Sequence, residues 1–204
     1  MRNVILALVL GACASQAASA ADIAERTRHF TVTGATLEEL DRSLARNGPM
    51  TGGGDAGHPG ATSVTFDGQV NYRPDGTRCR VAVANFQLRT EIILPRWKRP
   101  RKPDPVVVLL WETLERDVAR HEQQHADIAR NWVTRMEMAV RNLAPQRDCH
   151  AMETLVARTT NRYLDGHERA QHEFDRQESH EMSLRLRRLL RDRLRADSPA
   201  QAAD

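Results

Sequence analysis

Two histidines four residues apart, with a glutamate directly after the first, stand inside a long helical pattern: residues 121–125 read His-Glu-Gln-Gln-His. On a helix, residues four apart share one face, so His121 and His125 can both point at one ion. Glu122 is displaced by one residue, so it flanks that ion and can accept a proton from water. This spacing is typical of zinc metalloproteases, in which two imidazoles bind Zn²⁺ and the glutamate is the general base. The alternative is a pair of core histidines that bind no metal.

The pentapeptide supplies two protein ligands, and a catalytic zinc site takes a third from elsewhere in the chain. The extended metzincin pattern does not supply it, because neither Ile128 nor Ala129 is a glycine and no third histidine follows at the required place. The residues alone leave several candidates open. They are His167, His172, Glu173, Glu178, His180 and Glu153.

The helix that carries the motif is predicted by apolar residues that recur at steps of three and four from about 105 to 143, before Pro145. The positions 114, 118, 121, 125, 128 and 132 form one seam on this helix. Both histidines are therefore expected to face the interior, where an imidazole needs a partner. Further helices are expected over 149–165 and 167–196, the latter with a break near 180.

The half of the chain before this helix shows strand patterns. Apolar and polar residues alternate over 64–73 and over 82–94, and Pro74-Asp75-Gly76 between them is a turn sequence. This predicts an antiparallel hairpin with one buried face. A short strand at 29–33 and a helix at 36–46, begun by a capping box of Thr36 and Glu39, precede it. The prolines from 95 to 105 are expected to end the sheet. The predicted class is α+β: a small antiparallel sheet, then a helical half.

The first twenty residues have the pattern of an export signal. Arg2 precedes a short apolar run, and Ala18-Ser19-Ala20 is a small-residue cleavage site. The run is too short to span a bilayer. A competing interpretation is the lipobox-like Leu10-Gly11-Ala12-Cys13, in which cleavage would leave Cys13 attached to lipid. The predicted organisation is a signal peptide at 1–20, a domain at 21–181 and an Arg-rich helical tail at 182–204. Either form of cleavage places the protein outside the cytoplasm: periplasmic, secreted or anchored in the envelope.

Two cysteines remain after that signal, Cys79 and Cys149. One pair in an oxidising compartment suggests one disulfide, and two buried free thiols are the alternative. The formal charge is +3, or +2 once Arg2 is removed (29 Lys and Arg against 27 Asp and Glu). Such a balanced charge gives no general field that would attract nucleic acid, so no nucleic-acid partner is expected.

The motif and its surroundings resemble the DUF922 family of predicted secreted zinc-dependent proteases from bacteria, over about residues 28 to 181. Late in the chain, Phe174, Asp175 and His180 match the family's aromatic-Asp-x-x-Thr-x-His-Gly stretch, which has Thr and Gly where this chain has Glu178 and Glu181. The other matching elements are Asn47-Gly48-Pro49, Thr62, Cys79, Leu94-Pro95-x-Trp97, Trp111, the pentapeptide and Cys149.

The resemblance implies a zincin-like fold in which His180 is the third zinc ligand and Asp175 orients a ligand from outside the ligand set. It also implies that the 82–94 strand presents an edge along which an extended peptide lies. The expected function is that of an exported zinc-dependent metallopeptidase acting on a peptide or protein substrate, with Glu122 as base. Two alternatives remain: a zinc amidase acting on another amide such as cell-wall peptide, and a non-catalytic envelope protein with a structural metal site.

Overall fold

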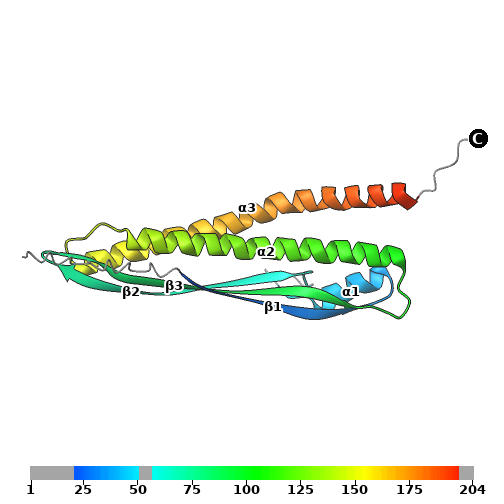
Figure 1. Ribbon diagram of the computed structural model, residues 1–204, viewed down its shortest axis with the longest axis horizontal. Coiled ribbons are helices and arrows are strands. Elements are labelled where there is room, and N and C mark those ends of the chain that lie inside the picture. Colours follow the sequence, from blue (N-terminus) through cyan, green and yellow to red (C-terminus); the bar gives the residue numbers. More distant parts are fainter. Residues whose placement is uncertain (1–20, 51–56, 198–204) are drawn as a thin grey trace, which may run out of the picture.

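The computed structural model describes residues 21–50 and 57–197, and from residue 179 on it describes the backbone and, of the side chains, only that of Arg188. The predicted signal peptide, the lipobox Cys13 and the last seven residues of the predicted tail lie outside this part. A three-stranded sheet is covered on one face by two long helices, and the molecule is elongated along them (Figure 1). The protein is of mixed α+β class, as predicted.

Strand β1 (Asp22–Thr33) and helix α1 (Leu37–Asn47) come first. Thr36 caps α1: its side chain accepts from the Glu39 amide, and the Glu39 side chain accepts from the Thr36 amide, which confirms the predicted capping box. The strand was predicted only from 29 on. Residues 22–28 are exposed and mostly polar, so they show no alternation that a sequence pattern could detect.

Strands β2 (Ala61–Asp75) and β3 (Arg78–Lys98) form the predicted antiparallel hairpin. Gly76 makes its turn with φ of 61°, a left-handed conformation that glycine adopts without strain. The sheet order is β1-β3-β2, and β1 runs parallel to β3. The prediction of a purely antiparallel sheet was therefore wrong. The prediction that the 82–94 strand presents an edge to an extended peptide was wrong for residues 87–93, which pair with β1 on one side and β2 on the other.

Strand β3 continues through the proline that was expected to end the sheet. Pro95 is opposite Phe30 of β1, and its side chain is fully buried. Pairing with β2 stops at Ile93, so among the described strands β3 has only β1 as a neighbour at Pro95. A residue without an amide hydrogen is tolerated at such a half-paired position. The sheet therefore reaches Lys98, and the later prolines end it.

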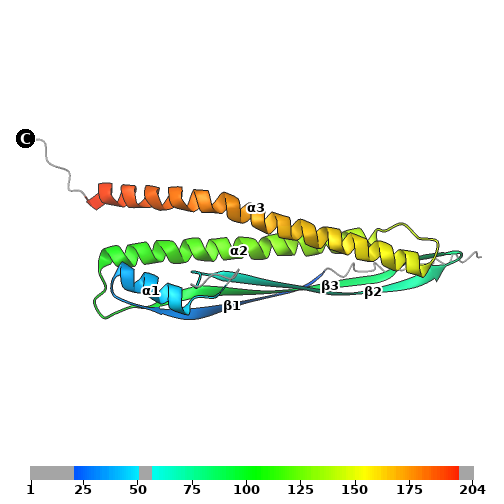
Figure 2. The same ribbon diagram turned by 180° about the vertical axis from the view of Figure 1, so that it is seen from behind.

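Helix α2 (Pro105–Arg141) lies along the sheet, and helix α3 (Cys149–Asp197) lies along α2 (Figures 1 and 2). The helical stretches predicted at 149–165 and 167–196 are one helix without the expected breaks. Gly166 does not interrupt it, and its missing side chain makes room for a neighbour: a Cβ there would lie 2.4 Å from the Trp132 ring. This glycine serves close packing of α3 on α2.

Two apolar clusters hold α2 to the sheet at its two ends. One, near the β1–α1 connection, contains Val32, Trp97 and Trp111. The other, at the hairpin end, contains Leu88, Met136 and further residues of β3, α2 and α3. The stretch of α2 around the pentapeptide lies between these clusters.

A disulfide between Cys79 and Cys149 joins the start of β3 to the start of α3. Gln146 pairs with Cys79 through two backbone hydrogen bonds of 2.8 Å, so the chain entering α3 is fixed to the sheet here. The predicted cysteine pair is thus present, and a disulfide indicates an oxidising, extracellular compartment. Among the helices in the described ranges, none has the length and apolar character needed to cross a bilayer.

Replacing both cysteines by serine should lower the free energy of unfolding by about 4 kcal/mol, because the bond constrains a loop whose ends are 70 residues apart. Urea unfolding of the oxidised protein and of the C79S/C149S variant measures the difference. The reduced wild-type protein should unfold like the variant. Equal urea midpoints for oxidised wild type and variant would contradict a stabilising role for this bond.

Candidate metal centre

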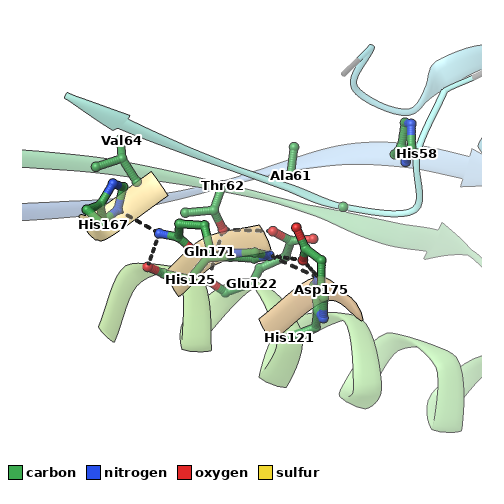
Figure 3. Close-up of a pocket in the computed structure, with 11 residues that line it drawn as sticks. His58, Ala61, Thr62, Val64, His121, Glu122, His125, His167, Gln171 and Asp175 are labelled. Carbon is green, nitrogen blue, oxygen red and sulfur yellow. Dashed lines mark hydrogen bonds and ion pairs between the residues drawn. The ribbon is translucent and has the colours of Figure 1, made fainter. Parts of the chain in front are cut away.

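His121 and His125 lie on the side of α2 that faces α3, with their ring nitrogens close together (Figure 3). The two Nε2 atoms are 3.1 Å apart, and the ring planes are inclined by 80°. Both side chains are largely buried, with 20% and 14% of their surface exposed. Burial lowers the pKa of His121, and the nearby His125 lowers it further, so the neutral, ligating form of this imidazole is favoured.

Asp175 reaches the same point from α3. Its Oδ1 lies 3.0 Å from Nε2 of His125 and 3.5 Å from Nε2 of His121. Phe174, the preceding residue, packs against both imidazole rings with centroid distances of 4.9 and 5.0 Å. Asp175 was predicted to act from outside the ligand set. Its carboxylate instead lies among the potential ligand atoms, which all fall within 4.8 Å of one another.

These three atoms fit the requirements of zinc. Ligand atoms at about 2.0–2.2 Å from a tetrahedral zinc are roughly 3.3–3.5 Å from each other. The observed separations of 3.0, 3.1 and 3.5 Å are close to that value. Two imidazoles and one carboxylate are also a usual donor set for a catalytic zinc. The side chains of His121, His125 and Asp175 are therefore close enough together that they could hold one metal ion.

The other ligand candidates from the sequence lie elsewhere or have other partners. The His180 side chain falls outside the described residues. His167 lies at the far end of the same cleft, with its ring edge-on to Phe66. Glu178 is buried and paired with Arg120. His172 is exposed and lies near Glu168, and Glu173 is paired with Arg176. Glu153 lies in the first turns of α3, and its charge adds to the effect of burial in raising the pKa of Tyr72.

The Glu122 side chain points toward the sheet, where it contacts Thr62 of β2. It is only 6% exposed, and burial raises its pKa above the usual value. The hydroxyl of Thr62 on β2 lies 2.8 Å from Oε2, and this hydrogen bond partly offsets the effect of burial. The α2 residues most deeply buried near the motif are Val118, Glu122, Ala126 and Ala129. The face of α2 against the sheet is thus centred on Glu122. The two histidines are largely buried, as predicted, and they face α3.

A cleft of about 480 Å³ opens beside these residues. Its walls come from the start of β2, from the pentapeptide on α2 and from one face of α3 (Figure 3). Gly60 contributes to the space: a Cβ at this position would lie 2.6 Å from Val118 and 2.9 Å from Oε1 of Glu122. The lining residues are His58, Gly60, Ala61, Thr62, Val64, His121, Glu122, His125, His167, Gln171 and Asp175.

Sequence reasoning missed Gln171, which contacts His125 directly. The signal that could have identified it is spacing, because Gln171 lies four residues after His167 and four before Asp175. On a continuous helix these three side chains share one face. The break expected between 165 and 167 concealed the stripe.

Replacing Thr62 by valine should destabilise the fold by about 1.5–3 kcal/mol, because a buried carboxylate loses its hydrogen-bond donor. The pKa of Glu122 should rise further. Urea unfolding measures the loss. Thr65→Val, on the exposed face of the same strand, is the matched control and should stay within about 0.5 kcal/mol of wild type. If the two variants have equal stability, the Thr62 hydrogen bond does not support Glu122.

Comparison with known proteins identifies one family. No protein with a curated description and no solved structure matches the chain. A family described as a bacterial protein of unknown function, DUF922, matches residues 27–181, which include β2, β3, most of β1, the pentapeptide, Asp175 and His180. The chain belongs to the DUF922 family.

Proposed function

We propose that this protein is an exported zinc-dependent metallopeptidase, in which His121, His125 and Asp175 hold Zn²⁺ and Glu122 is the general base. The observation that carries the proposal is the meeting of three potential ligand atoms, within 4.8 Å of one another, next to a buried carboxylate in an open cleft. The disulfide and the predicted export signal support the location outside the cytoplasm.

Zinc in such a site supplies a Lewis acid that polarises a carbonyl group and makes water a stronger acid. The protein's own contribution to the reaction centres on Glu122. Thr62 donates to Oε2, and within the described chain no side chain donates to Oε1. Gly60 leaves the space beside Oε1 open. Oε1 is therefore the oxygen that takes the proton from the attacking water and passes it to the leaving amine. The raised pKa of Glu122 suits a group that both accepts and returns a proton.

An open coordination position distinguishes this proposal from a structural metal site. A structural zinc usually has four protein ligands, whereas a catalytic zinc has three and a position for water or substrate. Three ligand atoms gather here among the described side chains, and they border a cleft. This arrangement favours catalysis.

The shape of the site favours an extended peptide as substrate. Gly60 and the first residues of β2 form one wall, and the stripe of His167, Gln171 and Asp175 on α3 forms part of the other. In the described part of the chain, β2 pairs only with β3, so its other edge has unpaired amides and carbonyls. A peptide that lies along such an edge can add to the sheet as a further strand. The strand that offers an edge is thus β2, in place of the predicted β3.

Replacing Glu122 by glutamine should leave zinc bound and reduce peptide hydrolysis about 10²–10⁴-fold, because the proton acceptor is lost while the ligands remain. The test uses the mature protein purified without chelators, with metal analysis and a broad peptide library. The matched control is Glu112→Gln, the same change on the same helix at an exposed residue paired with Arg99. If wild type keeps zinc and cuts no peptide, the peptidase proposal fails. If the wild-type protein is purified without bound metal, the proposed zinc site is contradicted as well.

The third ligand can be tested separately. Asp175→Ala should weaken zinc binding by more than the roughly 10–100-fold that loss of an outer hydrogen-bond partner causes. His180→Ala, which removes the ligand implied by family resemblance, should keep wild-type affinity. Competition with a zinc chelator measures both. The reverse result, with zinc lost from the His180 variant and kept in the Asp175 variant, would show that His180 is the third ligand and Asp175 is not.

A further inference from the structure

Gln171 makes three contacts that link α3 to the metal centre. Its Oε1 is hydrogen-bonded to Nδ1 of His125. Its Nε2 lies 3.1 Å from the backbone carbonyl oxygen of His125 and 2.8 Å from Nε2 of His167. The carboxamide therefore lies between the two imidazoles, as Figure 3 shows. Both the oxygen and the NH₂ group of the Gln171 amide thus have partners, and two of the three contacts are to His125.

One of these contacts fixes the direction of all the others. A backbone carbonyl oxygen can only accept, so the group of Gln171 that faces the His125 carbonyl must be its NH₂. The carboxamide oxygen then faces Nδ1 of His125. Because this oxygen can only accept, Nδ1 must carry the proton. In the neutral ring, Nε2 of His125 is then left with a lone pair, and it is directed at His121 and Asp175.

We propose that Gln171 is a positioning residue that holds His125 in the one tautomer able to bind metal through Nε2. The part of this inference that concerns metal rests on the proposed function, whereas the tautomer itself can be observed without metal. Ligand histidines in zinc sites commonly donate their second ring N–H to an acceptor, which fixes the ring and its tautomer. Here a neutral carboxamide from α3 has that role.

The same amide determines the state of His167. The second hydrogen of the Gln171 NH₂ group points to Nε2 of His167, so this nitrogen accepts and the proton of the neutral ring is on Nδ1. Burial lowers the pKa of His167 and so favours the neutral ring that can accept this bond. With its Nε2 occupied, His167 acts as a support for Gln171. This explains why a histidine in the cleft lies apart from the ligand cluster.

The two ligand histidines are not supported equally. Nδ1 of His121 is buried and has no hydrogen-bond partner among the described residues. His125 is therefore the preorganised ligand. Without metal, the lone pair on Nε2 of His125 accepts from a proton on Nε2 of His121, 3.1 Å away. For His121 to bind a metal through Nε2, the proton of its neutral ring must move to Nδ1, whereas His125 needs no change.

The experiment uses ¹⁵N-labelled protein, and long-range proton–nitrogen spectra recorded without metal at a pH at which the imidazoles are neutral. In wild type, His125 and His167 should both carry the proton on Nδ1. Gln171→Leu should release His125 from this tautomer and weaken zinc binding roughly 10–100-fold. Gln171→Glu keeps an acceptor for Nδ1 of His125. The His125 tautomer should therefore persist, with a zinc affinity at or above that of wild type. His167 loses its hydrogen-bond donor in this variant.

Gln177→Leu is the matched control: it removes an exposed glutamine on the same helix, bonded only to Glu173 among the described residues, and should change neither readout. The inference is overturned if wild-type His125 carries its proton on Nε2, or if Gln171→Leu keeps the wild-type tautomer and zinc affinity. If His125 carries its proton on Nδ1 and neither wild type nor any variant binds zinc, the role of Gln171 in fixing the tautomer stands and the proposed peptidase function fails. The wild-type spectrum alone decides the tautomer, so an unfolded variant does not prevent the test.

Discussion

Helix α2 buries the carboxylate of Glu122 against β2, and burying a carboxylate costs free energy unless hydrogen bonds or an opposite charge compensate. The same helix buries a second one, Glu137, which accepts from the Phe86 amide at 3.0 Å and forms an ion pair with Arg141 at 2.9 Å. Glu122 has the hydroxyl of Thr62 and, within the described residues, no ion pair. Glu137 is thus a compensated structural group, whereas the carboxylate form of Glu122 has less compensation, and a bound cation next to it would stabilise that form.

The centre also depends on how α3 docks on α2, because Asp175 and Gln171 both come from α3. Several contacts fix this docking along the pair. The disulfide holds the start of α3, Gly166 admits the Trp132 ring, and the buried Glu178 pairs with Arg120 one residue before His121. Since α3 is continuous, fixing it on either side of Asp175 also sets the height and rotation of that side chain. The relative positions of His121, His125 and Asp175 therefore depend on helix packing at several points along α2 and α3.

The parts of the structure that follow from local pattern could be predicted from the sequence. The capping box at Thr36, the hairpin, the long helix and the two histidines on one face all depend on residues near each other in the chain. What failed depends on distant partners. The parallel pairing of β1, the tolerance of Pro95 and the continuity of α3 at Gly166 each require knowledge of a neighbouring element. Likewise, the place of Asp175 among the potential ligand atoms and the contact of Gln171 with His125 depend on how α3 lies beside α2.

The candidate metal centre lies in the middle of α2, whereas the apolar residues that stabilise this helix against the sheet lie toward its two ends. This helix has 37 residues and is about 55 Å long, and the apolar clusters hold it to the sheet near its two ends. The first cluster includes Trp111 of α2, and the second includes Met136. Between them the helix does not need every inward side chain to be apolar, because its position is already fixed. The free-energy cost of burying polar groups in this stretch is offset by the contacts that hold the helix on either side. The middle of α2 can therefore carry a buried carboxylate and two imidazoles, which a short helix with a single core would have difficulty in holding.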